Sequence, residues 1–291
     1  IDEAHSHLIV AMAEPYSFMG PGNGRLEAIP FDPDTGLLDA DTAEAFDVDS
    51  IATNYADNDR INPVDMAIDR DTSTDHATAV IAAVRSDNWD ETPMGGAVFF
   101  VQIAAATGEM TPLATYFDTE DLFLNGLTAT LNYELEPHQV ALSRRDNVTR
   151  AYVVWSTAGF FTGGGPCEGT GMDKCVTVIT AHDLSSATPP VLLDGTFDGG
   201  LDLWLEMDYG NAAILALPGP EGNTRLAVGG GNLWTVNHYD APPGSSPAFE
   251  QHSLATQEYS TRGLTTDGSY LYWLTDSYID PFIIVPLTCG P

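Results

Sequence analysis

Lysine is nearly missing from this chain, and basic residues of any kind are scarce. Of 291 residues only 10 are lysine or arginine, and Lys174 is the single lysine, against 42 aspartates and glutamates. The formal net charge of −32 repels nucleic acid and anionic membrane surfaces, so we expect neither as a partner. Such an excess of acidic residues is compatible with a high salt concentration, because dissolved ions screen the repulsion between the negative charges. We therefore expect a marine or halophilic source, with an ordinary acidic secreted protein as the alternative.

Long apolar runs and helical patterns are also scarce. No apolar run approaches the length of about 18 residues that a membrane-spanning helix needs, so we expect no membrane span. The best helical candidate, residues 42–46, is too short to stand as a helix. No signal peptide is visible at the start, which fits a mature or truncated first residue.

Cysteine is rare, with three in the chain. Cys167 and Cys175 flank a short loop rich in glycine, which predicts a disulfide and hence an extracellular, cell-surface or periplasmic location. Cys289 is left over: it pairs outside this sequence, pairs between chains, or stays buried and free. No CxxC motif occurs, which argues against zinc ribbons and haem attachment.

A strand–turn–strand phrase recurs along the chain. Its first strands read PVDMAID (63–69), PHQVALS (137–143), a weaker DLWLEMD (202–208) and TRGLTTD (261–267), and its second strands read ATAVIAAV, RAYVVWST, NAAILALP and SYLYWLTD. The first strands end at intervals of about 74, 65 and 59 residues, a loose period typical of repeats with loop insertions. Residues 1–2 fit the end of one more first strand, with HLIVAMA (7–13) as its partner.

Each phrase is followed by further short strands, bounded by clusters of Gly, Pro, Asp and Asn. Units of about four antiparallel strands at this period predict an all-β fold, a β-propeller whose blades stack because one blade cannot bury both faces. Gly263 matches Asp65 and Gln139 in position, as expected for an innermost strand that crowds the central channel. A two-sheet sandwich also has short alternating strands but does not explain the recurring phrase.

Residues 1–291 are therefore predicted to form a single propeller domain with about five visible blades. The first unit lacks its opening strand and the fifth lacks its closing strand. Two interpretations are open: the ring has further blades outside this sequence, or a compact five-bladed ring closes between Ile1 and Phe282. We favour the first.

Three phrases resemble known propeller families. GRLEAIPFDPDTGLLDAD (24–41) and EPHQVALSRRDNVTRAYVVW (136–155) look like phrases of the lactonase-like, YVTN-type family, and LTTDGSYLYWLTD (264–276) is similar to a phrase of bacterial cell-surface propellers. The first resemblance implies a ring of about seven blades. Some members are sugar-lactone hydrolases or cycloisomerases with His, Arg and Glu in the channel, and many are surface or binding proteins. By this likeness His138 and Arg262 are the candidate catalytic residues, with Val64 at their counterpart position.

One acidic turn matches the start of a calcium loop. Asp69, Asp71, Ser73 and Asp75 place oxygen side chains at alternate positions, so all of them can point inward at a hard cation. The central Gly is missing, and Val80 stands where such loops carry a bidentate Glu. The sequence thus predicts a possible calcium site, with a solvated acidic turn as the alternative.

Two weaker constellations remain. His5 and His7 alternate, so on a strand they share one face and could chelate copper or zinc, although a hydrogen-bonded or exposed role is the alternative. Asp202 and Glu206 lie beside Trp204 and would suit a sugar site, or else are ordinary strand positions.

Nucleophilic catalysis finds little support, because no GxSxG elbow occurs and no Ser or Cys stands out beside a His. We predict an extracellular or cell-surface propeller that binds, adheres or assembles without catalysis. Protein partners or copies of the chain are its expected ligands, and carbohydrate is a further one. The alternative is a lactonase-like hydrolase or lyase that acts on a sugar or lactone through His138 and Arg262, and a metal-dependent redox or transport role is the third.

Overall fold

The structure is a computed structural model. It describes residues 7–12, 24–51, 60–70, 75–86, 95–117, 136–145, 148–156, 175–185, 191–194, 205–207, 213–219, 223–229, 231–239, 248–259, 261–275 and 282–287. Over these ranges the chain forms strands β1 to β19 and two short 3-10 helices, η1 (Ala40–Thr42) and η2 (Val48–Ile51), and no α-helix. No helix among the described residues has the length and apolar character needed to cross a bilayer.

The strands form five small antiparallel sheets, which we number as blades 1 to 5 in chain order. Blade 1 contains β1 (His7–Met12), β2 (Arg25–Pro30) and β3 (Glu44–Asp47). Blade 2 contains β4 (Arg60–Asp69), β5 (His76–Ser86), β6 (Gly96–Ala104) and β7 (Met110–Phe117).

Blades 3 to 5 follow the same order of neighbouring strands. Blade 3 contains β8 (Glu136–Arg145), β9 (Val148–Ser156), β10 (Cys175–Asp183) and β11 (Val191–Asp194), and β12 (Leu205–Met207) also pairs with β10. Blade 4 contains β13 (Ala213–Pro218), β14 (Thr224–Gly229), β15 (Gly231–Tyr239) and β16 (Ala248–Tyr259). Blade 5 contains β17 (Thr261–Thr266), β18 (Tyr270–Thr275) and β19 (Phe282–Pro286).

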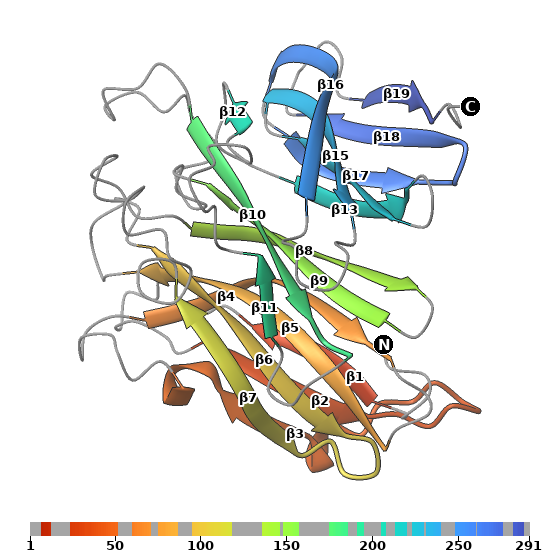
Figure 1. The fold of residues 1–291 in the computed structure, drawn as a ribbon. Helices are drawn as coiled ribbons and strands as arrows, with labels where there is room; N and C mark the ends of the chain where they lie inside the picture. Colours follow the sequence, from red (N-terminus) through yellow and green to blue (C-terminus); the bar gives the residue numbers. More distant parts are fainter. Residues whose placement is uncertain are drawn as a thin grey trace.

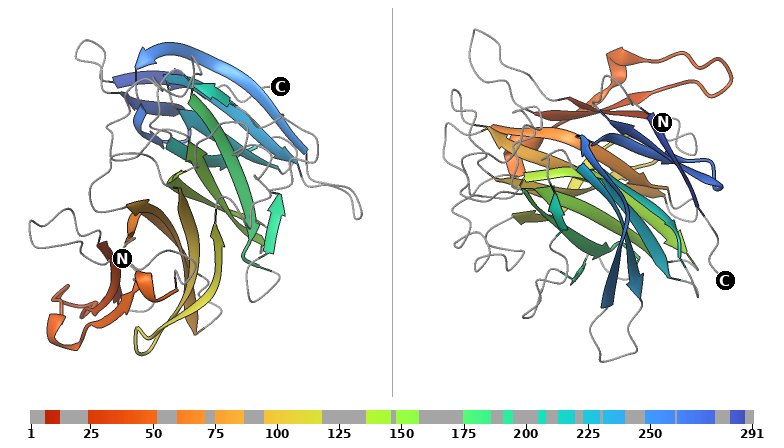
Figure 2. Two further views of the ribbon diagram at one scale, coloured as in Figure 1. Left: turned by 90° about the vertical axis from the view of Figure 1, so that its left-hand side faces the viewer. Right: turned by 90° about the horizontal axis from the view of Figure 1, so that it is seen from above.

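The blades follow one another around an arc (Figure 1). The first strands β4, β8, β13 and β17 contact one another in sequence, and β1 contacts β4. Four apolar clusters fill the spaces between successive blades. The predicted β-propeller fold of antiparallel blades is therefore confirmed. The arc is not closed: blade 1 (red to orange) and blade 5 (dark blue) lie at its two ends (Figure 2).

Strand β9 shows why the cores lie between blades. Its residues 151–156 are all buried, so its sequence is nearly continuously apolar rather than alternating. Because successive side chains point to opposite faces, Val153 and Trp155 pack against blade 2 while Tyr152 and Val154 pack against blade 4. Burying each such side chain contributes about 1.5–3 kcal/mol.

Glycine lets the next blade approach closely. A Cβ atom on Gly24 would lie 2.5 Å from Cδ of Pro63 in blade 2, and one on Gly96 would lie 2.4 Å from Cδ of Pro137 in blade 3. The prolines occupy matching places near the start of β4 and β8. No side chain fits at either glycine unless the neighbouring blade moves.

The repeat predicted from sequence has matching irregularities in three blades. The β4–β5 register shifts between Pro63 and Asp65, and the β8–β9 register shifts between Pro137 and Gln139. The β17–β18 register shifts between Thr261 and Gly263. These β-bulges confirm the predicted equivalence of the first strands in the second, third and fifth units.

The prediction for the fourth unit is wrong. Within residues 202–208 only β12 is described, and it pairs with β10 at the edge of blade 3. The first strand of blade 4 is instead β13, which pairs with β14 and contacts both β8 and β17. The alternation of DLWLEMD resembles a half-buried strand, whereas the innermost place is taken by the uniformly apolar AILAL of residues 213–217.

Candidate functional site

The two predicted catalytic residues occupy matching bulges in different blades. His138 of β8 and Arg262 of β17 are the residues skipped by the shifted registers, and Val64 is their counterpart in β4. A bulge re-aims its side chain, and the three differ accordingly: His138 is buried, Val64 half-buried and Arg262 exposed. Blade 4 lies between the blades of His138 and Arg262. Their catalytic role stays a prediction.

The residue after each bulge links neighbouring blades. The backbone N–H of Val140 donates to Oδ2 of Asp65 at 2.7 Å, across from blade 2 to blade 3. One blade further, the N–H of Ile214 donates to Oε1 of Gln139 at 2.9 Å. The same position is Ala213 in blade 4, which carries no acceptor. The sequence pattern correctly predicts that Asp65 and Gln139 are equivalent. It does not predict that their side-chain oxygens accept hydrogen bonds from backbone N–H groups of the next blade.

Asp65 carries a half-buried carboxyl group. Burial raises the pKa of Asp65, and the hydrogen bonds from the N–H groups of Val140 and Met66 only partly offset that effect. Gln139 performs the same task with an uncharged amide. The inner strands are thus joined by polar side chains whose acceptors meet backbone donors.

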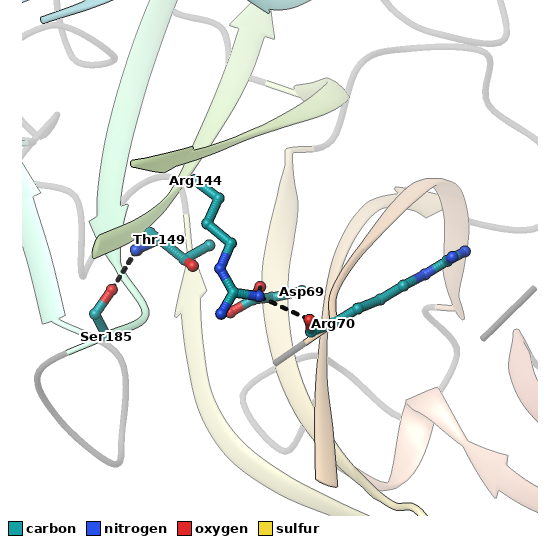
Figure 3. Close-up of polar contacts among 5 residues, drawn as sticks. All are labelled: Asp69, Arg70, Arg144, Thr149 and Ser185. Carbon is teal, nitrogen blue, oxygen red and sulfur yellow. Dashed lines mark hydrogen bonds and ion pairs between the residues drawn. The ribbon is translucent and has the colours of Figure 1, made fainter. Parts of the chain in front are cut away.

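Two adjacent arginines at the end of β8 reach in opposite directions. Nη1 of Arg144 donates to the carbonyl oxygen of Arg70 at 2.7 Å and lies 3.8 Å from Oδ1 of Asp69, both in blade 2. Figure 3 shows Arg144 extended toward the end of β4, and the turn contact between Ser185 and the Thr149 N–H nearby. Nη1 of Arg145 instead donates to the Asn223 carbonyl at 2.7 Å, beside blade 4.

The possible calcium turn is described at its two ends only. Asp69 is largely buried beside Arg144, whereas Asp75 is fully exposed, with Oδ1 at 3.1 Å from Nδ1 of its neighbour His76. The hydrogen bond from His76 lowers the pKa of Asp75. Asp71 and Ser73 lie outside the described residues, so calcium binding stays a prediction.

The remaining metal and disulfide candidates are mostly outside the described residues too. His7 is buried in β1, and a Cβ on Gly108 would lie 3.0 Å from its ring, but His5 is not described. Cys167 is not described either, and Cys175 opens β10. In the described part of the chain no three His, Cys, Asp or Glu side chains form a group that could hold a metal ion.

Two histidines that the sequence left unplaced are buried between blades. Thr180 Oγ1 accepts from Nε1 of Trp155 at 2.9 Å and lies 3.0 Å from Nε2 of His182. The hydroxyl of Tyr152 lies 2.8 Å from Nδ1 of His238. Burial lowers the pKa of His182 to about 3, so this imidazole is neutral at physiological pH. One ring nitrogen of each histidine therefore lies within hydrogen-bond distance of a hydroxyl inside the core.

The aromatic residues divide into two groups. Trp155 and Trp273 are fully buried, so they belong to the core between blades. Tyr270 and Tyr272 instead belong to one face of blade 5, and Tyr270 is 45% exposed. The indole N–H of Trp273 donates to Oγ1 of Thr261 at 2.8 Å on the opposite face of the sheet.

We call the side of a blade that is turned toward the next blade its forward face, and the opposite side its rear face. Strand register identifies four equivalent positions at the centre of each forward face, two on the second strand and two on the third. They are Val80, Ala82, Val98 and Phe100 in blade 2; Tyr152, Val154, Ile179 and Ala181 in blade 3; Ala227, Gly229, Leu233 and Thr235 in blade 4; Tyr272, Leu274, Phe282 and Ile284 in blade 5.

The twelve positions in blades 2 to 4 are buried, whereas the forward face of blade 5 is open. Leu274 is 41% exposed, Phe282 54% and Ile284 55%. In the register, Leu274 lies opposite Phe282, and Tyr272 lies opposite Ile284, so the four side chains form one continuous patch. Contiguous exposed apolar side chains of this kind mark interaction surfaces.

A hairpin turn fixes one end of that patch. Asp267 accepts hydrogen bonds from the Ser269 and Tyr270 N–H groups through Oδ1 and from the Tyr272 hydroxyl through Oδ2 at 2.6 Å. Gly268 adopts a positive φ of 90°, which the tight turn requires. The hydroxyl bond from Tyr272 lowers the pKa of Asp267 and raises that of Tyr272. The patch therefore ends in an ordered polar edge.

No protein-family model and no curated protein matches the chain. Among solved structures, the chain is similar to the β-propeller domain of Vanderwaltozyma polyspora Nup133, with a TM-score of 0.48 and 8% identity over 96% of this chain and 71% of that one. A putative 6-phosphogluconolactonase from Bacteroides uniformis has a TM-score of 0.45 and 14% identity, covering 96% and 67%. The extracellular domains 1-2 of Drosophila Semaphorin 1b have a TM-score of 0.42 and 11% identity, covering 98% and 64%.

Likeness at these identities and TM-scores says nothing about function. The class of protein is set by the sheets themselves: this chain is an open array of β-propeller blades, each packed on the next around the line of first strands.

Proposed function

We propose that this protein is a binding or assembly module of the extracellular space or cell surface, and that the forward face of blade 5 is its docking surface for a protein partner. The observation that supports this is the exposed patch of Tyr272, Leu274, Phe282 and Ile284. The equivalent residues of blades 2 to 4 are all buried. A partner that offers a second apolar sheet face would remove the patch from water, at roughly 25 cal/mol per Å² of apolar area buried.

An apolar fluorescent probe such as bis-ANS tests the surface itself. We expect the folded protein to bind the probe, and the variant Leu274→Glu/Ile284→Glu to lose most of that binding. Leu37→Glu is the matched control, because Leu37 is 70% exposed in a turn away from blade 5. Equal probe binding by the double variant and the control would refute the docking surface.

A second assay separates this function from lactone or sugar chemistry. The wild-type protein and His138→Ala are compared on a panel of lactones and glycosides, with thermal unfolding as a check on folding because His138 is buried. The binding module predicts no turnover by either protein. Turnover by the wild type that falls in the folded variant would replace the proposal with the enzymatic alternative.

Three features of the proposal rest on composition and spacing. The spacing of the cysteines supports secretion, and the net charge of −32 supports a saline habitat. A disulfide joins Cys167 to Cys175, and calcium binds the turn from Asp69 to Asp75. Thiol titration of the denatured protein tests the disulfide, which predicts at least two more titratable thiols after reduction than before it. Elemental analysis after dialysis against calcium tests the metal, and absence of bound calcium would refute it.

A further inference from the structure

We infer that the junction of blades 4 and 5 is a hinge, at which blade 5 swings away from a rigid unit formed by blades 2 to 4. The hinge lies on the rear side of blade 5, so it is independent of the docking surface on the forward face.

Polar side chains fasten blade 3 to blade 4 at two places along strand β8. Near the beginning of β8, Oε1 of Gln139 accepts from the N–H of Ile214 at 2.9 Å. Near its end, Oγ of Ser143 lies 2.9 Å from Oγ1 of Thr224. Because hydrogen bonds are directional, ties at two places along one strand oppose rotation of the neighbouring blades relative to each other.

Two further side chains of blade 3 complete this set of ties. Nη1 of Arg145 donates to the Asn223 carbonyl at 2.7 Å. The hydroxyl of Tyr152 lies 2.8 Å from Nδ1 of His238. Blade 3 thus reaches blade 4 through the side chains of Gln139, Ser143, Arg145 and Tyr152.

The junction of blades 2 and 3 is fastened at the same two places along β8. Near the beginning, the N–H of Val140 donates to Oδ2 of Asp65 at 2.7 Å. Near the end, Nη1 of Arg144 donates to the Arg70 carbonyl at 2.7 Å. Polar ties along both junctions therefore hold blades 2, 3 and 4 as one unit.

Blade 4 lacks these groups on the side that faces blade 5. Strand register and the matching N–H bonds place Ile214 at the position of Val140. The same register gives the blade 4 equivalents of Gln139, Ser143, Arg145 and Tyr152 as Ala213, Leu217, Gly219 and Ala227. None of these four side chains can donate or accept a hydrogen bond, so none of the four ties repeats between blades 4 and 5.

Apolar contacts hold blade 5 against blade 4 instead. Leu217, Ala227 and Leu233 of blade 4 pack with Leu271 and Trp273 of blade 5. Apolar packing is non-directional, so it opposes separation of the two sheets without fixing the angle between them.

The pivot of the hinge lies at the beginning of β17. Strand β16 ends at Tyr259 and β17 begins at Thr261, so one residue connects the two blades. At the same end, a Cβ atom on Gly229 would lie 2.7 Å from Oγ1 of Thr261. At the opposite end Gly219 takes the place of Arg145. Rotation about Thr261 therefore opens the junction from that end.

Opening at this hinge uncovers a second apolar surface. The forward positions of blade 4, including Ala227, Gly229 and Leu233, are buried in the closed arrangement. In the open arrangement they reach solvent. The equivalent positions of blades 2 and 3 stay covered, because polar ties hold the next blade in place.

Native-state hydrogen exchange tests the hinge, read by mass spectrometry in urea below the unfolding transition. Strands β17 and β18 should exchange through a partial opening, ~10-fold or more faster than β8 and β9, because blade 5 opens while blades 2 to 4 stay folded. Exchange of all four strands at one rate, in a single global step, would overturn the inference.

Removal of two ties should turn the junction of blades 3 and 4 into a second hinge. In Gln139→Ala/Ser143→Ala we expect exchange in β13 and β14 to rise ~10-fold, since each lost hydrogen bond contributes modestly. The control Gln139→Glu/Ser143→Thr keeps an acceptor and a hydroxyl, and should exchange like the wild type. Circular dichroism checks that both variants are folded. Equal exchange in the two variants would mean that the ties do not hold the junction and that blade 5 merely frays.

The reverse change adds a tie to the hinge. Ala213→Gln supplies an acceptor at the position of Gln139, and Ala213→Met supplies a side chain of similar length without a strong acceptor. We expect β17 and β18 to exchange ~3-fold to 5-fold more slowly in the Gln variant than in the Met variant. Equal exchange in these two folded variants would contradict the assignment of the hinge to the missing ties.

Discussion

The forward faces of blades 2 and 5 consist of equivalent residues, but the face of blade 2 is buried and the face of blade 5 is exposed. Phe100 and Ile284 hold the same place in the strand register, and both are large and apolar. Phe100 is fully buried under blade 3, whereas Ile284 is 55% exposed. A large apolar residue at this position is suited to burial by the next blade. Ile284 is exposed because no described element lies on the forward face of blade 5.

The largest expected effect separates these two positions. Phe100→Ala removes a ring from a closed interface and should lower the free energy of unfolding by about 3–5 kcal/mol. Ile284→Ala removes a half-exposed side chain and should lower it by about 0.5 kcal/mol or less. Urea unfolding of the dilute monomer measures both. A loss in Ile284→Ala as large as that in Phe100→Ala would show that the blade 5 face is already covered.

The sequence predicts the strands of both blades, but it does not predict that one face is buried and the other exposed. The β-branched and aromatic residues of RAYVVWST and SYLYWLTD predict strands, and the recurring phrase predicts the positions of β4, β8 and β17, because turn residues and bulges are local features. The openness of the blade 5 face could not be predicted, because Leu274 and Ile284 are as apolar as buried residues. Burial depends on the neighbouring blade, which the sequence of one strand does not reveal.

Dependence on neighbouring blades also explains the other points at which the structure differs from the sequence predictions. The alternation in DLWLEMD predicts a first strand, but alternation alone does not distinguish an innermost strand from an edge strand. The hydrogen bonds from the Val140 N–H to Asp65 and from the Ile214 N–H to Gln139 join residues 75 positions apart, so only the packing of the blades shows them. His138 and Arg262 were correctly placed at equivalent positions, yet equivalence in a repeat does not make residues neighbours.

A smaller effect tests the junction of blades 4 and 5. A Cβ on Gly229 would lie 2.7 Å from Oγ1 of Thr261 in blade 5. Gly229→Ala should therefore lower the free energy of unfolding by about 1–3 kcal/mol, since the two blades must move apart. Gly263→Ala is the control, because nothing lies within 4 Å of a Cβ built there. Similar thermal midpoints for the two variants would contradict the described packing.

The next effect concerns the pH dependence of the link between blades 2 and 3. Burial raises the pKa of Asp65 above its value in the unfolded chain, so the folded protein binds the proton more tightly. The contribution of this group to stability is then greatest below the ordinary Asp pKa of 3.8 and is lost as pH rises through the raised value. Asp65→Asn should remove this pH step while it keeps an acceptor for the Val140 N–H, as Gln139 does one blade further.

Asp65→Ala provides the matching control, because it removes the acceptor as well as the charge. It should lower the free energy of unfolding by about 1–3 kcal/mol at pH 4, where it leaves the Val140 N–H without its acceptor. Urea unfolding across the acid range compares the three proteins. An Asn variant whose stability follows the same pH curve as the wild type would show that Asp65 does not titrate in this window.

The smallest effect lies at the edge of the blade 5 face. The hydrogen bond from the Tyr272 hydroxyl to Asp267 raises the pKa of Tyr272 above its ordinary value. Tyr272→Phe should leave the thermal midpoint nearly unchanged, because both groups are in contact with water. In Asp267→Asn the tyrosine absorbance should titrate at a lower pH than in the wild type. An unchanged titration curve would mean that the bond does not persist in solution.

Hydroxyl-radical footprinting read by mass spectrometry tests the central claim most directly, because it reports the exposure of equivalent side chains in one sample. In dilute protein at low salt we predict strong oxidation of Leu274, Phe282 and Ile284 and almost none of Val98 and Phe100. Equal protection of both faces in the dilute monomer would contradict the account.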